Sequence, residues 1–333
     1  MATYFITGGL GFIGFHLTER LLNQGEKVII YDAQKHYVPL DRSNWTYYLD
    51  YRIQKLRGRD VEIVRGDCTD AGWLKESLEK YKPDVIVHLA ALPIAGISND
   101  YPAEARGNIF DSTVTLLDTL KNVKFSFDRV LYTSSSMVYG EFLRDDNQNI
   151  IAASEDQVCN PIDIYGAMKL SGEYMVKAYN YRFGIPYVII RPSAVYGHTD
   201  CNMRVTEMFL LNAIRKMPLL VENKGMHQVD FTFIDDLIDG YILCAKENNA
   251  LGQTFNLTHG QGRTIGELAD ILMQLVPGAT IEMSDVMPYR PNRGTLNIAK
   301  ATRLLGYQPK VSLEEGMKRY YEQIIKDNIW RND

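Results

Sequence analysis

Gly8-Gly9-Leu10-Gly11-Phe12-Ile13-Gly14 is the stretch that decides the fold of this chain. It follows an apolar run, Thr3 to Thr7, with the character of a buried strand, and precedes an amphipathic helix that ends near Asn23. Glycines at 8, 11 and 14 let the backbone approach a diphosphate closely, and the helix N-terminus presents free N–H groups to it. The stretch therefore predicts a strand–turn–helix unit that binds a dinucleotide through Gly8, Gly11, Phe12, Ile13 and Gly14.

A carboxylate at the end of the second predicted strand indicates which dinucleotide is bound. Val28 to Tyr31 is the strand, and Asp32 ends it. A carboxylate there can accept hydrogen bonds from both hydroxyls of an adenosine ribose and would repel a 2′-phosphate. We therefore expect NAD rather than NADP. The following segment, 33–60, is expected to be an insertion with a helix over Trp45 to Leu56, whose aromatic stripe serves packing.

Strands and helices continue to alternate as far as a sixth parallel strand, Val188 to Arg191. In a doubly wound sheet, ligands bind at the carboxyl ends of the strands. This rule places Asp67 beside the adenine and Ala90 beside the cofactor ribose. His88 lies inside an apolar strand and is expected to be a hydrogen-bonded core residue. The other cofactor contacts predicted at this edge are Cys68, Leu89, Ala91, Asn108, Ser134, Tyr165, Lys169 and Pro192.

Tyr165 and Lys169 are four residues apart in Tyr165-Gly166-Ala167-Met168-Lys169, which puts both side chains on one face of a helix. A free tyrosine has a pKa of about 10 and is a poor base at neutral pH. The lysine ammonium and an oxidised nicotinamide are expected to lower that pKa. The serine run Ser134-Ser135-Ser136 ends a strand at the same edge of the sheet. Ser135 can therefore hydrogen-bond the substrate oxygen that Tyr165 deprotonates.

The sequence changes character after Arg191 and becomes loop-rich. We expect an α/β fold, a Rossmann-type doubly wound parallel sheet with a smaller C-terminal α/β substrate lobe. Residues 1–191 form the predicted NAD-binding domain, to which 229–258 return, and 192–228 with 259–333 form the substrate lobe. The elements predicted beyond Arg191 are a loop (Pro192 to Gly197), a helix (Val205 to Lys216), a strand (Asp230 to Phe233), a helix capped by Asp235-Asp236 (Leu237 to Lys246), a strand (Thr254 to Leu257), a helix (Ile265 to Val276), a loop (Pro288 to Gly294) and a last helix (Leu313 to about Lys326).

The amino-acid composition limits the classes of protein to which this chain can belong. The chain has 333 residues, of which 46% are hydrophobic and 23% charged, an ordinary globular balance. A net charge of -5 provides no basic surface for nucleic acid or an anionic membrane. No apolar run approaches the roughly 20 residues that span a bilayer, and no basic segment precedes the first strand. The four cysteines are scattered, so we expect free thiols, no metal site and a cytoplasmic protein.

Taken together, these motifs resemble the extended short-chain dehydrogenase/reductase family, and within it the nucleotide-sugar epimerases and dehydratases. The resemblance also rests on Ala299-Lys300 and Leu305-Gly306-Tyr307-Gln308-Pro309, so that it spans nearly the whole chain. It implies a catalytic triad of Ser135, Tyr165 and Lys169, tightly held NAD, and a nucleoside-diphosphate sugar under the C-terminal lobe. A polysaccharide or glycoconjugate pathway is the expectation for such a family.

Two positions after the triad serine favour one reaction. The family's 4,6-dehydratases carry Asp and Glu there, an acid and a base that eliminate water; this chain has Ser136 and Met137. Methionine cannot exchange a proton. What remains resembles the 4-epimerases, so we expect 4-epimerisation through a transient 4-keto sugar. Oxidation at C4, 3,5-epimerisation with Cys159 or Cys201 as acid or base, and dehydration stay open. A protein that binds NAD without chemistry is disfavoured because Tyr165 and Lys169 are both present.

Departures from the family pattern leave the sugar open. Many members have Asn where Ala194 stands, and Arg where Val229 stands. The diphosphate still needs cations, and Arg204, Arg290 and Arg293 are the candidates. The sugar could be a uronate, a deoxysugar or a heptose. The predicted substrate contacts are Ser135, Ser136, Met137, Ala194, Arg204, Arg290 and Arg293.

The resemblance also implies a homodimer. Helices over Ala103–Leu120 and Tyr165–Phe183 would pair with their copies in a four-helix interface. Apolar side chains on these helices would then be only partly covered in the monomer. The residues in question are Leu116, Leu117, Leu120, Leu170 and Met175.

Overall fold

A seven-stranded, all-parallel sheet forms the centre of the protein in a computed structural model that describes residues 1–37, 44–284 and 293–328. Its strand order is β11-β6-β5-β4-β1-β2-β3, so the chain builds one half of the sheet, returns, and builds the other. The direction reverses between β1 and β4, which is where a doubly wound sheet opens a binding crevice. The predicted fold class is confirmed. The strands are β1 (Thr3–Thr7), β2 (Lys27–Asp32), β3 (Val61–Arg65), β4 (Val85–His88), β5 (Arg129–Thr133), β6 (Tyr187–Pro192) and β11 (Gln253–Leu257).

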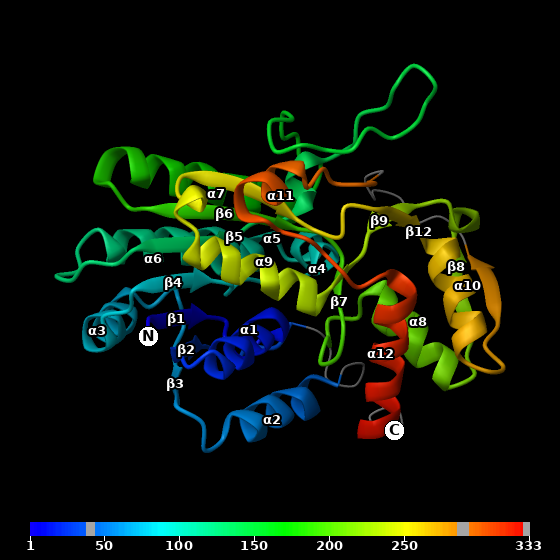
Figure 1. The fold of residues 1–333 in the computed structure, drawn as a ribbon, viewed down its shortest axis with the longest axis horizontal. Helices are drawn as coiled ribbons and strands as arrows, with labels where there is room; N and C mark the ends of the chain where they lie inside the picture. Colours follow the sequence, from blue (N-terminus) through cyan, green and yellow to red (C-terminus); the bar gives the residue numbers. More distant parts are fainter. Residues whose placement is uncertain (38–43, 285–292, 329–333) are drawn as a thin grey trace.

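Apolar residues on both faces of the strands explain why the sheet is buried between two helical layers. Successive residues of a strand point to opposite faces. Thus Ile6 and Ile30 enter one core, while Phe5 and Ile29 enter the other, and none of the four is exposed. Figure 1 shows α1 and α9 lying together across one face of the sheet. The helices of this layer are α1 (Phe12–Asn23), α2 (Trp45–Leu56) and α9 (Ile234–Lys246); those of the other layer are α3 (Ala71–Tyr81), α6 (Ser112–Leu120) and α7 (Ile164–Phe183).

The helix predicted over Ala103–Leu120 is present, but it is not a uniform α-helix. It comprises α5 (Pro102–Ala105), a π-helical turn (Arg106–Asp111) and α6, and it follows the short α4 (Ala95–Asp100). A π-helical turn inserts one extra residue per turn and re-aims the side chains around it. Asn108 lies in this turn, where its side-chain oxygen accepts a hydrogen bond from the Tyr37 hydroxyl (3.1 Å).

Figure 1 shows the smaller C-terminal lobe beside the carboxyl edge of the sheet, with α12 and α10 at its outer side. In the part of the lobe that the structure describes, helices accompany pairs of short strands rather than a continuous sheet. The helices are α8 (Val205–Ile214), α10 (Ile265–Leu275) and α12 (Leu313–Asp327), and α11 (Ala299–Leu305) lies near β11. The strand pairs are β7 (Val195–Tyr196) with β10 (Thr232–Phe233), β8 (Leu219–Glu222) with β13 (Ile281–Ser284), and β9 (Gln228–Asp230) with β12 (Gly262–Thr264).

Three details of this half correct the sequence prediction. The predicted loop Pro192 to Gly197 begins with the last residue of β6 and contains β7. The predicted strand Asp230–Phe233 is split at Phe231, because its two halves pair with different partners. Asp235 and Asp236 do not cap α9 but lie in its first turn. Asp236 instead accepts backbone N–H groups from residues 310 and 311 (2.9 Å each), which ties α9 to the segment leading into α12.

Residues 229–258, which are predicted to return to the first domain, pair with two different parts of the molecule. β11 joins the large sheet beside β6, and α9 packs on α1. Residues 228–230 and 232–233, in contrast, pair within the small two-stranded sheets and not with the large sheet. The boundaries of the two domains therefore stay a prediction.

Three of the five apolar side chains expected to be partly covered in a monomer are already buried. Leu116, Leu117 and Leu120 are at most 3% exposed, because α6 lies between α3 and α7 and turns this face inward. Leu170 and Met175 are half-buried. The homodimer itself stays a prediction, which light scattering at micromolar concentration tests. Within the described residues, none of the helices is both long and apolar enough to span a bilayer.

Candidate active site

A cavity of about 870 Å³ lies at the carboxyl edge of the central sheet, between the sheet and the C-terminal lobe. Most of the residues that the sequence predicts as site residues lie in its wall. From the cofactor prediction these are Gly8, Gly11, Phe12, Ile13, Gly14, Asp32, Leu89, Ala90, Ala91, Ser134 and Pro192. From the triad and substrate predictions these are Ser135, Ser136, Met137, Tyr165, Lys169, Ala194, Arg204 and Arg293.

Asp67, Cys68 and Asn108 are not in this wall. They line a small adjoining cavity of about 30 Å³. Lys35 stands at its entrance, with its amine 2.5 Å from the Asp67 carboxylate. Burial raises the pKa of the Cys68 thiol to about 12, so this thiol stays protonated at neutral pH. Arg290 lies outside the described residues.

The glycine stretch forms a tight turn that only glycine can build. Gly8 has a φ of +70°, and a Cβ there would lie 2.8 Å from the backbone nitrogen of Ala90. A Cβ on Gly14 would lie 2.6 Å from the Cα of Gly9 and closer still to the carbonyl oxygen of Gly8. Helix α1 begins at Phe12 without a side-chain cap, so its first N–H groups are available to an anion. These residues fit the diphosphate of a dinucleotide.

Asp32 is held in place by two backbone donors. Its carboxylate accepts the N–H of Leu10 (2.9 Å) and the N–H of Gln34 (2.7 Å). Burial raises its pKa, and these two hydrogen bonds oppose the rise. The carboxylate thus stands at the end of β2, against the glycine turn, where the ribose hydroxyls of NAD can reach it.

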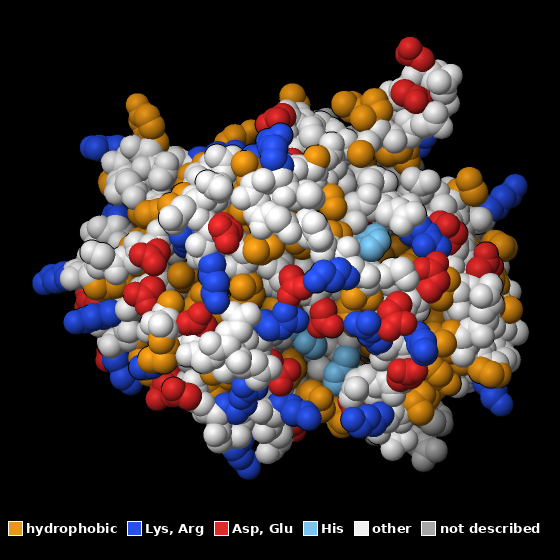
Figure 2. All heavy atoms as spheres, viewed as in Figure 1, with side chains coloured by type: hydrophobic (Ala, Val, Ile, Leu, Met, Phe, Trp, Pro, Cys, Tyr) orange, Lys and Arg blue, Asp and Glu red, His pale blue; other side chains and the backbone are white. Residues whose placement is uncertain are grey.

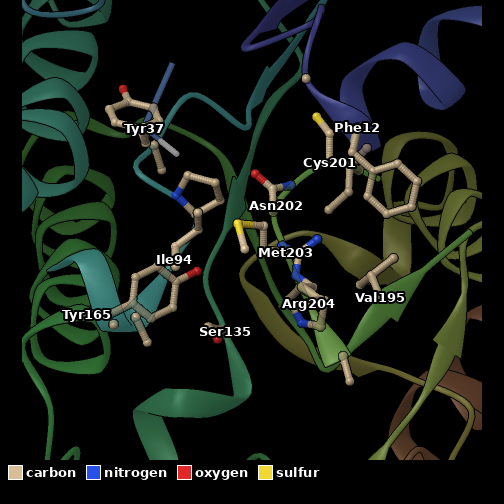
Figure 3. Close-up of a pocket in the computed structure, with 18 of the residues that line it drawn as sticks. Phe12, Tyr37, Ile94, Ser135, Tyr165, Val195, Cys201, Asn202, Met203 and Arg204 are labelled. Atoms are coloured by element: carbon tan, nitrogen blue, oxygen red, sulfur yellow. The ribbon is translucent and has the colours of Figure 1, made fainter. Parts of the chain in front are cut away.

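Tyr165 lies in the first turn of α7, which Asp163 caps by accepting the Gly166 N–H (2.6 Å). Figure 3 shows its hydroxyl directed into the cavity, with Ser135 nearby and Met203 and Arg204 on the facing wall. The expected lowering of its pKa is wrong for the protein alone. Burial raises the pKa of Tyr165, and the charge of Arg204 and the hydrogen bond with Ser135 only oppose this rise. The desolvation of the phenolate outweighs both.

Lys169 lies one helical turn beyond Tyr165 on the same face of α7, with its amine 5.9 Å from the centre of the Tyr165 ring. The side chain is buried, and its amine donates to the backbone carbonyl of Thr133 (2.8 Å). Burial lowers the pKa of Lys169 to about 7, against the opposing charge of Glu173. The charge of this lysine is therefore sensitive to any anion or cation that enters the cavity.

A buried ion pair supports the triad, and sequence reasoning missed it. Arg191 donates two hydrogen bonds to Glu173 (2.9 and 2.7 Å), and the Ser134 hydroxyl donates to the same carboxylate. Ser134 thus lines the cavity, but its hydroxyl is hydrogen-bonded to Glu173 behind the cavity wall. Two signals could have revealed the pair: an arginine that ends an apolar strand, and a glutamate four residues after Lys169.

The segment that faces Tyr165 carries unusual backbone conformations. Ala194, Thr199 and Met203 have φ values of +33°, +70° and +53°, in the left-handed region that favours glycine and asparagine. Arg204 follows them and pairs with the buried Asp200 (2.9 Å). Such conformations persist only where surrounding contacts hold them.

The insertion helix α2 also reaches the cavity, although its side chains were assigned to packing. Trp45, Leu49 and Arg52 all lie in the cavity wall. Arg52 is only 1% exposed, and sequence reasoning missed it. An arginine amid the tyrosines of an amphipathic helix was the one available signal.

The two cysteines considered for acid–base chemistry differ in position. Cys201 lies in the cavity wall, whereas Cys159 is not among the lining residues. Burial raises the pKa of Cys201 to about 11 and also raises that of Cys159. Neither thiol is poised to exchange a proton at neutral pH.

Comparison with known proteins agrees with this geometry. Residues 4–258 match the NAD dependent epimerase/dehydratase family. The chain is 28% identical to the uncharacterized UDP-glucose epimerase YtcB of Bacillus subtilis, over 94% of each protein. It is 29% identical to UDP-glucuronic acid decarboxylase 1 of Arabidopsis thaliana, over 94% of this chain and 68% of that protein.

A solved structure shows the same fold over the whole chain. It is the UDP-glucuronic acid 4-epimerase from Bacillus cereus in complex with UDP-glucuronic acid and NAD, with a TM-score of 0.87 and 29% identity over 97% of this chain and 99% of that one. The resemblance drawn from the sequence motifs is thereby confirmed. With the glycine turn, Asp32 and the Tyr165–Lys169 pair at one cavity, the chain belongs to the NAD dependent epimerase/dehydratase family, and its cofactor is NAD.

Proposed function

We propose that this protein is an NAD-dependent nucleoside-diphosphate-sugar 4-epimerase that acts through a transient 4-keto sugar. The observation that carries the proposal is the cavity wall beside Ser135. The two residues that follow it, Ser136 and Met137, both line the cavity, and neither is a carboxylic acid. Elimination of water from the sugar needs an acid and a base, and these positions supply none. Removal and return of the C4 hydrogen needs no further side chain beyond the triad, with NAD as acceptor and donor of the hydride.

The proposed chemistry assigns one task to each member of the triad. Tyr165 takes the proton of the sugar C4 hydroxyl. After the keto sugar has rotated to present its other face to the cofactor, Tyr165 returns the proton to the same oxygen. Ser135, which hydrogen-bonds Tyr165, orients that oxygen. Lys169, fixed by the Thr133 carbonyl, holds positive charge beside the phenol. NAD, when bound, supplies the acceptor and donor of the C4 hydride.

Two arginines in the cavity wall support the binding of an anionic sugar nucleotide. Arg204 lies opposite Tyr165 (Figure 3). Arg293 also lines the cavity, and its backbone pairs with Gln228, the first residue of β9. Arginine suits a diphosphate because its planar guanidinium can bind two oxygens at once. Arg204 already forms an ion pair with Asp200. A bound diphosphate would therefore share the positive charge of Arg204 with this carboxylate.

Other outcomes from the same 4-keto sugar form the alternative. Net oxidation at C4 would leave NADH, 3,5-epimerisation would need a base beside C3 and C5, and dehydration would need an acid at C6. Cys201 is the thiol in the cavity wall that such a base could use, and its raised pKa weighs against that role.

A panel of nucleotide sugars incubated with the protein in deuterated water, followed by proton NMR, tests the proposal. A new 4-epimer without deuterium is expected, because the C4 hydrogen returns directly. Deuterium at C3 or C5, or a stable ketone with accumulated NADH, would contradict 4-epimerisation and support the alternative. UDP-glucuronate and UDP-glucose are the first substrates to try, because relatives of this chain are named for them.

A further inference from the structure

Arg52 is a buried cation that joins two parts of the cavity wall. From α2, one of its terminal nitrogens donates to the carbonyl of Leu10 in the glycine turn (2.8 Å), and the other donates to the carbonyl of Thr199. Leu10 belongs to the cofactor side and Thr199 to the segment that faces Tyr165. The guanidinium is therefore a bridge between backbone groups that are far apart in the sequence.

On the cofactor side, Arg52 helps to fix one residue of the glycine turn, Leu10. The N–H of Leu10 donates to Asp32, and the carbonyl of the same residue accepts from Arg52. Both polar groups of this residue are thus committed, one to the carboxylate that fits the ribose and one to the guanidinium. A change in the glycine turn on NAD binding would be felt directly at Arg52.

On the sugar side, Arg52 holds a residue in an unfavourable conformation. Thr199 has a φ of +70° and no exposed surface. Its carbonyl accepts from Arg52, and its hydroxyl lies 3.3 Å from Nε2 of His16 on α1. Figure 2 shows histidine side chains at the surface where the sheet-bearing part meets the C-terminal lobe. The next residue, Asp200, holds Arg204, so the contact chain continues to the wall opposite Tyr165.

Arg52 is buried without a direct ion pair. Within residues 1–37, 44–284 and 293–328, no carboxylate contacts its guanidinium, and its Nε has no hydrogen-bond partner. The carboxylates of Asp32 and Glu207 interact with its charge from farther away. Burying a cation without a contacting acid is costly, so it persists only where its other contacts or a ligand compensate. Arg52 lines the cavity beside the turn that fits a diphosphate, and an anion there would add negative charge near it.

We propose that Arg52 is a positioning residue that couples NAD binding to the order of residues 199–204, the segment that faces Tyr165. The inference rests on the proposed function, because it takes that segment to be the sugar side of the site. Its test requires NAD alone, so it fails or succeeds independently of which sugar is bound or which reaction follows.

The test compares two buried arginines. Arg129 is a matched control: it is buried, its Nη1 donates to the carbonyls of residues 244 and 247 (3.1 and 2.7 Å), its Nε has no partner, and it does not line the cavity. Arg52→Lys keeps the charge but cannot span both carbonyls. We expect it to weaken NAD binding about tenfold by calorimetry, as for a lost charged hydrogen bond, while Arg129→Lys changes it less than about twofold.

Hydrogen–deuterium exchange measures directly whether NAD binding orders residues 199–204. In the wild-type protein, NAD should slow amide exchange in peptides that cover 198–204; in Arg52→Lys this slowing should be lost, and in Arg129→Lys it should be kept. Unchanged exchange of 198–204 on adding NAD to the wild-type protein overturns the proposal, whether or not the variants fold. So does an Arg52→Lys protein that binds NAD and protects this segment as the wild type does, since its arginine would then serve stability only.

Discussion

The two walls of the cavity achieve their shape in opposite ways. On the cofactor wall, the positive φ at Gly8 falls on a glycine, and the close approach at Gly14 is made where no Cβ exists. On the sugar wall, Ala194 and Met203 adopt left-handed conformations although each has a side chain, and so does the fully buried Thr199 in the same segment. The first wall is therefore built into the sequence, while the second must be held by its neighbours.

Two buried side chains hold the backbone of the sugar wall in these left-handed conformations. Arg52 binds the carbonyl of Thr199, and Glu207 accepts the N–H of Met203 (2.8 Å). Both side chains are buried and ionisable, and burial raises the pKa of Glu207 well above its usual range. A wall that depends on such contacts can respond to a ligand more readily than a turn whose conformation glycine adopts without strain.

Replacing Tyr165 by Phe should have the largest effect, because it should abolish turnover without changing the cofactor wall. Turnover should fall about 10³-fold or more, because the group that exchanges the C4 proton is lost. NAD binding should stay nearly intact, since the glycine turn and Asp32 are untouched. Steady-state rates and a NAD titration measure both effects. Tyr179→Phe, which removes a hydroxyl from the same helix outside the cavity, should keep wild-type turnover; a comparable loss there would point to helix damage.

A methyl group at Gly14 should damage the cofactor wall. Gly14→Ala would push a Cβ into the backbone of Gly8 and Gly9 and should cost about 3 kcal/mol of folding free energy, with loss of NAD binding. Urea unfolding and a NAD titration check this. Gly107→Ala serves as the control, because a Cβ there meets nothing within 4 Å. If both variants bind NAD equally well, the close approach at Gly14 does not matter.

Lys169 should make stability depend on pH in the protein without nucleotide. Its pKa is about 7 when folded and about 10.4 in an unfolded chain, so between these values the unfolded state binds more protons. Stability relative to Lys169→Met should therefore rise from pH 7 towards pH 9.5, by up to about 1.4 kcal/mol per pH unit. Urea unfolding at several pH values measures the slope. Lys177→Met, an exposed change on α7, should keep it; a slope unchanged in Lys169→Met would contradict the assignment.

The smallest effect is expected on the sugar wall. Ala194→Gly should raise the free energy of unfolding by about 0.5–1 kcal/mol, because glycine adopts a positive φ without strain. NAD affinity should not change. Ala178→Gly, at an exposed position in the interior of α7, should lower stability by about 1 kcal/mol, which is the opposite sign. A loss of stability in both variants would mean that position 194 is not strained.

Local patterns in the sequence determined the cofactor side almost completely. The parallel strands up to Arg191, the glycine turn, Asp32 and the Tyr165–Lys169 face were all predicted from spacing, because each depends on residues close together in the chain. The fold class and NAD followed from them and are confirmed. The bounds of α2 were also correct, because its periodicity is local.

Only the tertiary structure decided what lies opposite the cofactor. The Arg52 bridge joins residues 10, 52 and 199, and the Arg191–Glu173–Ser134 cluster joins two strand ends and a helix. The burial of Leu116 and Leu117, the split of the strand after Asp230 and the rise in the pKa of Tyr165 likewise depend on which segments pack together. Spacing along the chain predicts which side chains share a face, but desolvation and long-range partners arise only when distant segments meet.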